Sequence, residues 1–318
     1  MAQKNSRTLL AIVGPTASGK SHLGILIARR LNGEIISADS RQVYKYLSIG
    51  TAKPSEEERH GIPHHFMDIC EPTQEYSAGQ FGIEARQTID ELFARNGQPI
   101  LVGGSGLYIK AVIDGLFESG ERREEIRRQL EEEYRQRGVQ WLYGKLQEVD
   151  PETAKTIDRN NARRIIRALE IYYVTGKPKS LHVEAQQSAP PFSTIQIGLE
   201  WNRVELYNRI EQRVDEMLAK GLLDEVKMLQ EKGYSPTLNS LNTVGYKEAF
   251  EFLDGKIPYD TMVALIKRNT RRFAKRQLTW FRSDKRIRWF PVQKDTDWEK
   301  LADEICQYFL ERSNSINC

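Results

Sequence analysis

The sequence predicts an α/β protein in which helices cover both faces of a parallel sheet, with an all-helical insertion as a second domain. Short apolar runs bounded by turn residues alternate with helical segments, as they do around parallel strands. A glycine-rich loop follows the first apolar run directly. Between residues 116 and 184 the β-type runs stop and only helical patterns remain.

Four apolar runs are the predicted strands. Thr8–Val13 has the composition of a buried strand, and Glu34–Ala38 and Pro99–Val102 are two further short β-rich runs. Thr194–Trp201 resumes the β pattern after the helical stretch. Because helical segments separate these runs, we expect the strands to lie parallel.

The change of pattern also predicts the domain boundaries. We expect a core over residues 1–115 and 192–318 and a helical insertion over residues 116–191. The insertion contains two amphipathic stretches, GERREEIRRQLEEEYRQRG and NNARRIIRALEIYYVTGK. The segment AQQSAPP at residues 185–191 has the composition of a linker back to the core.

Length, charge and cysteine usage narrow the class of protein. A chain of 318 residues exceeds the usual single domain, and its net charge of +3 says less about partners than the clustering of its basic residues does. Cys70, Cys306 and Cys318 lie far apart, which predicts neither a disulfide framework nor a zinc site. No apolar stretch has the length of a signal peptide core or a membrane span. We expect a monomer in the cytoplasm without membrane association.

Residues 14–21 read GPTASGKS and match the pattern G-x-x-x-x-G-K-[ST] between a strand and a helix. Backbone N–H groups of such a loop surround two linked phosphates. The predicted diphosphate-binding residues are Gly14, Pro15, Thr16, Ala17, Ser18, Gly19, Lys20 and Ser21. Lys20 is expected to neutralise phosphate charge, and Ser21 to ligate Mg²⁺ as the cofactor. The core is therefore predicted to be P-loop NTPase-like, although ATP and a prenyl diphosphate both supply two linked phosphates.

The second and third predicted strands each end in polar or glycine-rich sequence. Ligands of open α/β sheets bind beyond the carboxyl ends of the strands, which places Asp39 opposite the phosphate loop. Three roles are open for Asp39: a helix cap, a kinase-like ligand or base for a hydroxyl, and a base for an amine in group transfer to nitrogen. Its place beside a P-loop favours the functional roles over the cap.

Seven segments together resemble the bacterial tRNA dimethylallyltransferase family: GPTASGKS, ADSRQVYKYLSIGTAKP, GIPHHFMDI, LVGGSGLYIKAV, NNARRIIRALEI, NTVGYKE and AKRQLTWFR. They occur in order along the chain, and the match as a whole runs from about Thr8 to Arg282. The resemblance implies transfer of a dimethylallyl group from dimethylallyl diphosphate to N6 of the adenosine at tRNA position 37. It also implies that the helical insertion grips the anticodon stem-loop.

The resemblance further implies roles for individual residues. The predicted catalytic residues are Asp39, Thr16 and Arg213: Asp39 matches the family's general base, Thr16 acts from the diphosphate loop, and Arg213 stabilises the departing diphosphate. Arg213 lies on a predicted helix over Val204–Lys220, where it shares a face with Arg209 at i, i+4 spacing. Spacing alone predicts a solvated face for both arginines, and the resemblance reverses this for Arg213 only.

The target base must leave a stacked loop to react, so tRNA contacts are expected around the cavity and on basic helices. The residues predicted to bind tRNA are Asp39, Ser40, Arg41, Gln42, Ser105, Arg127, Arg163, Arg164, Ile165, Ile166, Arg167, Lys275, Arg276 and Gln277. Lys275, Arg276 and Gln277 have the alternative of lining the diphosphate site. Phe273 and Phe281 are expected to pack inward from this basic segment, and Trp280 is expected to serve the core.

Three other functions fit parts of the sequence. An adenylate isopentenyltransferase would use free AMP, ADP or ATP as acceptor, but its relatives generally lack the full RNA-gripping insertion. A P-loop small-molecule kinase would need a lid of paired arginines, which the sequence does not show in recognisable form. An RNA-binding protein without catalysis would have no use for Lys20, Ser21 and Asp39 together.

Overall fold

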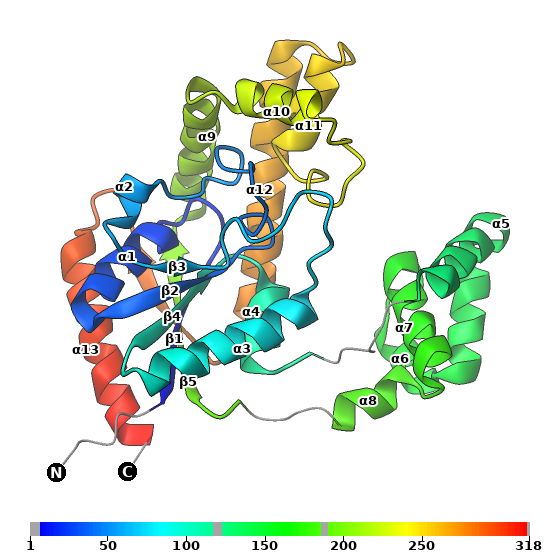
Figure 1. Cartoon of the computed structure of the whole chain (residues 1–318), viewed down its shortest axis with the longest axis horizontal. Helices are drawn as coiled ribbons and strands as arrows, with labels where there is room; N and C mark the ends of the chain where they lie inside the picture. The colour runs from blue at the N-terminus through cyan, green and yellow to red at the C-terminus, as the bar shows by residue number, and fades with distance from the viewer. Residues whose placement is uncertain (1–6, 117–122, 186–189, 317–318) are drawn as a thin grey trace. The chain divides into compact units, whose positions relative to one another are not determined.

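The structure is a computed structural model that describes residues 7–116, 123–185 and 190–316. The chain divides into two compact units, residues 1–113 with 190–318 and residues 114–189 (Figure 1). Most of the predicted linker, residues 186–189, and Cys318 lie outside the described residues. Within the described part, no helix has the length and apolar character needed to cross a membrane.

The core unit contains a six-stranded sheet in which every neighbouring pair is parallel, as predicted. The strands, in the order β3-β2-β4-β1-β5-β6, are β1 (Thr8–Val13), β2 (Gly33–Ala38), β3 (His64–His65), β4 (Gln98–Gly103), β5 (Ser193–Trp201) and β6 (Ile287–Val292). The sequence does not predict β3, which is only two residues long, or β6, which contains a proline. Both lie at edges of the sheet, where a short strand or a proline is tolerated.

Helices cover both faces of this sheet, which confirms the predicted α/β class. Along β1, Leu10 and Ile12 join one apolar cluster and Leu9, Ala11 and Val13 join the other, so both faces are buried. The first cluster is closed by α1 (Lys20–Leu31) and α13 (Trp298–Ile316), and the second by α3 (Ala78–Ala94) and α4 (Gly106–Ile113). The short helix α2 (Glu56–Arg59) precedes β3.

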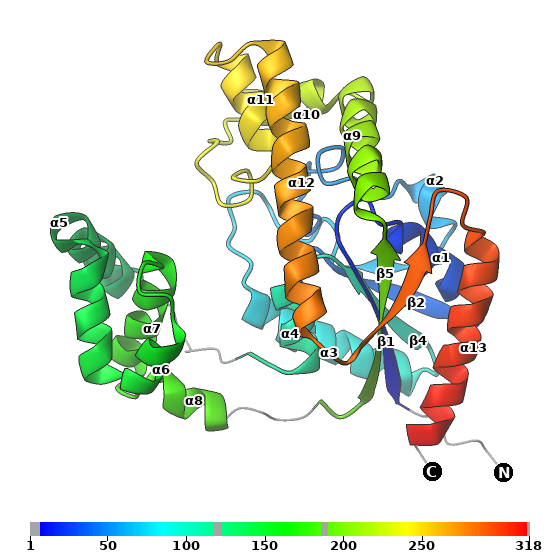
Figure 2. The same cartoon turned by 180° about the vertical axis from the view of Figure 1, so that it is seen from behind.

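Four further helices of the core unit follow β5, beyond the carboxyl ends of the strands (Figures 1 and 2). They are α9 (Arg203–Ala219), α10 (Leu222–Glu231), α11 (Tyr246–Leu253) and α12 (Tyr259–Ser283). Helix α9 contacts α10 and α12, and α11 contacts α10 and α12. This layer therefore provides a wall opposite the loops that leave β1, β2 and β4.

The second unit is helical throughout its described residues, as predicted. It contains α5 (Glu124–Val149), α6 (Pro151–Thr156), α7 (Ala162–Thr175) and α8 (Lys179–Ala185). Its own core includes Leu142 and Leu146 of α5 and Ile165 and Leu169 of α7. Helix α5 bends at Gly138, whose φ of 79° is available to glycine at little cost.

Strands β2 and β4 lie close together at Gly103, so a substitution there tests their packing. A Cβ at residue 103 would overlap the carbonyl oxygen of Ala38, a backbone atom of the paired strand. We expect Gly103→Ala to lower the free energy of unfolding by about 1–3 kcal/mol, because a central strand has to shift.

Chemical denaturation measures this change, with Gly144→Ala on α5 as the control. A Cβ at residue 144 meets open space, so alanine should leave stability unchanged or raise it by about 0.5–1 kcal/mol. An unfolding midpoint for Gly103→Ala equal to that of the wild type would contradict the close approach.

Candidate functional site

The phosphate loop between β1 and α1 is held in shape by side chains from outside the loop. Trp201 Nε1 donates to the carbonyl oxygen of Ser18 at 2.9 Å, and Arg209 Nε donates to that of Ala17 at 2.9 Å. On the opposite side of the loop, Gln277 Oε1 accepts the backbone N–H of Thr16 at 2.9 Å. These partners come from β5, α9 and α12, so the loop's shape depends on the whole core unit.

Two residues of this loop have left-handed backbone conformations. Ala17 has a φ of 62° and Gly19 a φ of 90°. A Cβ at residue 19 would also overlap the indole ring of Trp298, so glycine is required there for two reasons. A non-glycine residue keeps a positive φ only where surrounding contacts fix it, and such residues cluster at functional sites.

Helix α1 begins at Lys20 without a side-chain cap on its first N–H groups. The N-terminus of a helix carries unpaired N–H donors and a partial positive charge, which together bind phosphate. The side chain of Ser18 has its hydroxyl buried without a partner among the described residues. The loop therefore offers several donors to an anion, as the motif predicts, while Thr16 N–H is already engaged by Gln277.

Lys20 and Arg213 bring positive charge to the mouth of the loop. Lys20 Nζ donates to the carbonyl oxygen of Pro15 at 3.1 Å. Burial, and then the nearby charge of Arg213, lower the pKa of Lys20 to about 8, against a smaller opposing effect of Asp39. Burial likewise lowers the pKa of Arg213. The two cations are therefore buried at one site, and a bound anion would reduce the free-energy cost of keeping them charged there.

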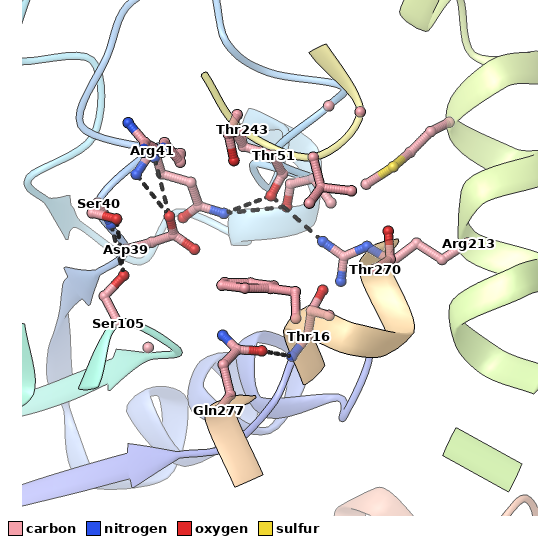
Figure 3. Close-up of a pocket in the computed structure, with 18 of the residues that line it drawn as sticks. Thr16, Asp39, Ser40, Arg41, Thr51, Ser105, Arg213, Thr243, Thr270 and Gln277 are labelled. Carbon is pink, nitrogen blue, oxygen red and sulfur yellow. Dashed lines mark hydrogen bonds between the residues drawn. The ribbon is translucent and has the colours of Figure 1, made fainter. Parts of the chain in front are cut away.

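Asp39 follows β2 and faces the same cavity (Figure 3). Its Oδ1 accepts the backbone N–H groups of Arg41 at 2.9 Å and Gln42 at 3.4 Å, so one oxygen caps the turn. No hydrogen bond to Oδ2 is found among the described residues. Beside it, Ser105 Oγ accepts Ser40 N–H at 2.9 Å and fixes the loop after β2 against the loop after β4. Asp39 can therefore cap the turn through Oδ1 and act as a base through Oδ2.

Gln42 and Arg213 meet at one backbone carbonyl. Gln42 Nε2 donates to Thr51 O at 3.2 Å, and an Arg213 terminal nitrogen donates to the same oxygen at 3.4 Å (Figure 3). Gln42 is buried, and its Oε1 accepts from Ser37 Oγ at 3.1 Å. The sequence predicts no role for the loop that carries Thr51, because the contact uses a backbone carbonyl, which every residue type has.

Arg209 also belongs to the site, although spacing and resemblance both leave it on a solvated face. Its guanidinium lies over the Trp201 ring, 4.5 Å from the centroid, and holds the Ala17 carbonyl. Burial lowers its pKa. The i, i+4 spacing with Arg213 is the one signal in the sequence that could have identified it, since the two arginines share the helix face toward the loop.

One cavity of about 510 Å³ is lined by Thr16, Lys20, Ser21, Asp39, Gln42 and Arg213, whereas Ala17, Ser18, Gly19 and Arg209 lie outside its lining. Its polar floor carries Thr16, Lys20, Ser21, Asp39 and Arg213, and it is bordered by Ser40, Arg41, Gln42, Ser105, Arg276 and Gln277. Its apolar wall is formed by Ile210, Val214, Met217, Val244, Ile266 and Phe273. A cavity of this size with a charged end and an apolar wall suits a small amphiphilic ligand.

The three residues Lys275, Arg276 and Gln277 of α12 have different surroundings. Gln277 is buried with Oε1 on Thr16 N–H and Nε2 donating to Gly104 O at 2.9 Å, so its amide braces the phosphate loop. Arg276 lines the cavity, whereas Lys275 is exposed outside it. Whether these residues contact tRNA stays a prediction.

Two aromatic residues on α12 differ from expectation. Phe273 is 39% exposed and lines the cavity, and Trp280 is 41% exposed, so the predictions of inward packing are wrong for both. Phe281 is 2% exposed, as predicted. The helix has one broad polar face, and packing against α4 and α9 selects which aromatic residues are covered.

The predicted magnesium ligand Ser21 lines the cavity beside Lys20 and Thr16. Among the described residues, no group of three His, Cys, Asp or Glu side chains could hold a metal ion. Mg²⁺ binds through few protein ligands, several waters and phosphate oxygens, so a single hydroxyl beside a diphosphate loop fits this ion. His64 and His65, which are neighbours in the chain, hydrogen-bond to Ile62 O and to the Glu34 carboxylate at the edge of the sheet.

The helical unit presents arginines on its surface. Arg163 and Arg164 are exposed near the start of α7, while Arg127 and Arg167 pair with Glu131 and Glu170. The residues between them, Ile165 and Ile166, are 0% and 9% exposed in the unit's core. This corrects the prediction of tRNA contacts for these two side chains, because on a helix only one face of RRIIR can point outward.

Comparisons with known sequences agree on one family. A sequence model of the IPP transferase family matches residues 42–284. The tRNA dimethylallyltransferase of Carboxydothermus hydrogenoformans is 50% identical over 302 residues, which cover 94% of this chain and 96% of that protein. That of Pelotomaculum thermopropionicum is 45% identical over 309 residues, covering 96% and 98%.

Solved structures give the same result. The full-length tRNA isopentenylpyrophosphate transferase of Bacillus halodurans matches with a TM-score of 0.72 and 42% identity, covering 98% of this chain and 99% of that one. A eukaryotic dimethylallyltransferase acting on tRNA matches with a TM-score of 0.81 and 30% identity, covering 94% and 77%.

Proposed function

The chain belongs to the IPP transferase family, and we propose that it transfers a dimethylallyl group from dimethylallyl diphosphate to N6 of the adenosine at tRNA position 37, releasing diphosphate. Membership makes it an enzyme, a prenyltransferase that acts on tRNA. The observation that carries the residue roles is that Asp39, an apolar wall and three residues of the phosphate loop, Thr16, Lys20 and Ser21, line the same cavity.

The diphosphate of the donor is proposed to bind at the phosphate loop and the start of α1. The unpaired N–H groups of the first helical turn and the ammonium of Lys20 meet its oxygens. Ser21 and the diphosphate oxygens would hold Mg²⁺, which when bound neutralises part of the diphosphate charge. The dimethylallyl group then lies along Val214, Met217 and Phe273 of the apolar wall, which exclude water from the reacting carbon.

The adenine amine attacks the first carbon of the dimethylallyl group as the bond from that carbon to the diphosphate oxygen breaks. Asp39 Oδ2 accepts the proton that the amine loses, while Oδ1 stays on the backbone N–H groups that orient the carboxylate. Negative charge builds up on the departing oxygen. Lys20 and Arg213 are held where they stabilise it without reorganisation.

The acceptor base has to leave the anticodon loop to reach this cavity. Arg41 and Arg276, at the cavity, and Arg163 and Arg164, on the helical unit, are proposed to bind the RNA backbone. We propose that the active form is a monomer. We propose that it acts in the cytoplasm, where its tRNA substrate is found.

An adenylate isopentenyltransferase is the alternative that shares this cavity chemistry. The helical unit favours tRNA, because a free nucleotide would need none of its exposed arginines. A small-molecule kinase would need ATP as donor, and the apolar wall suits a prenyl group better than a second polar substrate.

The proposed function is tested by mass analysis of nucleosides from tRNA incubated with the protein and dimethylallyl diphosphate, with AMP as a parallel acceptor. We expect dimethylallyl adenosine from tRNA and none from AMP. Asp39→Asn removes the base and should lower kcat by about 10²–10⁴-fold, whereas Asp295→Asn, exposed and outside the cavity, should not. Product from AMP alone, or full activity of Asp39→Asn, would refute the proposal.

The lowered pKa of Lys20 predicts a pH dependence. Below about pH 8 the side chain is an ammonium and attracts the diphosphate, and above it the neutral amine does not. We therefore expect kcat/KM for dimethylallyl diphosphate to fall above pH 8, by about tenfold per pH unit. Lys20→Arg keeps its charge, so its lower kcat/KM should stay flat between pH 7 and 9.5. A flat profile for the wild type would show that Lys20 does not titrate there.

A further inference from the structure

We infer that Glu225 is a positioning residue for the transfer reaction: it fixes the loop of residues 48–52, and that loop orients Arg213 and Gln42 in the cavity. The inference rests on the proposed function, in which Arg213 stabilises the departing diphosphate. Glu225 lies on α10, outside the cavity lining, and acts through backbone groups.

The carboxylate of Glu225 is 9% exposed and receives four hydrogen bonds. Its Oε2 accepts the backbone N–H groups of Ser48 at 2.9 Å and Ile49 at 2.7 Å. Its Oε1 accepts Gly50 N–H at 3.1 Å and the Tyr246 hydroxyl at 2.5 Å. A buried carboxylate that accepts several N–H groups is a strong local anchor, because charge-assisted hydrogen bonds exceed neutral ones in strength.

Tyr246 completes this anchor from α11. Burial and the adjacent Glu225 raise the pKa of Tyr246, so its hydroxyl stays protonated and donates at every working pH. A Cβ at residue 50 would lie 2.5 Å from the Tyr246 ring, so Gly50 allows the ring to pack directly on the loop backbone. The loop is thus held by a carboxylate and an aromatic ring at once.

The anchored segment leads directly to the cavity. Thr51 O accepts from both Gln42 and Arg213, and Ala52 O accepts from Gln42 Nε2 at 3.4 Å. Ala52 has a left-handed φ of 46°, which a non-glycine residue keeps only when neighbouring contacts fix it. Ala52 N–H donates to Ile49 O at 2.9 Å, and Glu225 holds Ile49 through its own N–H, so the anchor also fixes Ala52.

Arg213 depends on this loop for its direction. Its Nε is buried without a partner among the described residues, and a terminal nitrogen donates to Thr51 O. A shift of that carbonyl would turn the guanidinium away from the phosphate loop. A misplacement of about 1 Å in a catalytic group can reduce the rate about 100-fold even when the substitution is distant.

Glu225→Gln is the first test, because it keeps the side chain's shape and replaces one acceptor oxygen with a donor. We expect kcat to fall about 10- to 100-fold, with a smaller rise in KM for dimethylallyl diphosphate, since charge on the departing oxygen builds up in the transition state. Tyr246→Phe removes one of the four donors and should show a smaller loss. Glu231→Gln, exposed on the same helix, is the matched control and should retain wild-type kinetics.

A double-mutant cycle separates positioning from general destabilisation. Glu225→Gln is measured in the wild type and in Arg213→Ala, once by turnover with tRNA and once by calorimetric affinity for inorganic pyrophosphate. Positioning through Arg213 predicts that, in the wild type, Glu225→Gln lowers turnover about 10- to 100-fold and weakens the affinity for pyrophosphate several-fold, and that it adds nothing in Arg213→Ala.

Equal losses in both backgrounds would overturn the inference and indicate a structural role, which thermal unfolding of each variant would register as well. The pyrophosphate measurement does not require tRNA as acceptor. If the wild type binds pyrophosphate but does not modify tRNA, the proposed function fails while the cycle still decides the role of Glu225. Tyr246→Phe keeps the cycle informative if Glu225→Gln does not fold.

Discussion

The phosphate loop keeps its shape because side chains from three distant elements hold its backbone. Trp201 and Arg209 bind consecutive carbonyls, and Gln277 binds the Thr16 N–H. Ala17 and Gly19 are thereby kept at positive φ, which turns unpaired N–H groups toward one point. The sheet, α9 and α12 must all be in place before the loop can bind a diphosphate, so binding capacity and folding of the core unit are coupled.

The same enclosure explains the electrostatics of the cavity. Burial is the main cause that lowers the pKa of Lys20, Arg209 and Arg213. The charge of Arg213 adds to this shift for Lys20 and the charge of Arg209 adds to it for Arg213, while Asp39 opposes both shifts. The site therefore holds buried positive charge at a cost in free energy, which a bound anion would reduce. In the proposed mechanism the same cations also hold the released diphosphate, so product release has to overcome their attraction.

The sequence predicted those features that residues close together in the chain determine, namely four strands and the phosphate loop. Short apolar runs bounded by turn residues identified β1, β2, β4 and β5, and the motif at residues 14–21 located the loop, because a strand followed by a glycine-bounded turn is specified by neighbours in the chain. Arg209, Glu225 and the Thr51 carbonyl were not predicted, since their roles arise from packing between elements over 150 residues apart. Phe273 shows the converse: which residues of a helix are covered depends on neighbouring elements that periodicity does not reveal.

The two units imply a division between chemistry and recognition. Every group proposed to act on the donor or on the transferred proton lies in the core unit, and the helical unit has its own apolar core and exposed arginines. A free nucleotide could meet the first set of groups without the second, whereas an anticodon stem-loop carries enough backbone phosphate to engage both. In the proposed function, discrimination between tRNA and AMP arises from binding energy gained remote from the reacting atoms, which drives extrusion of the base into a cavity that would otherwise accept any adenine.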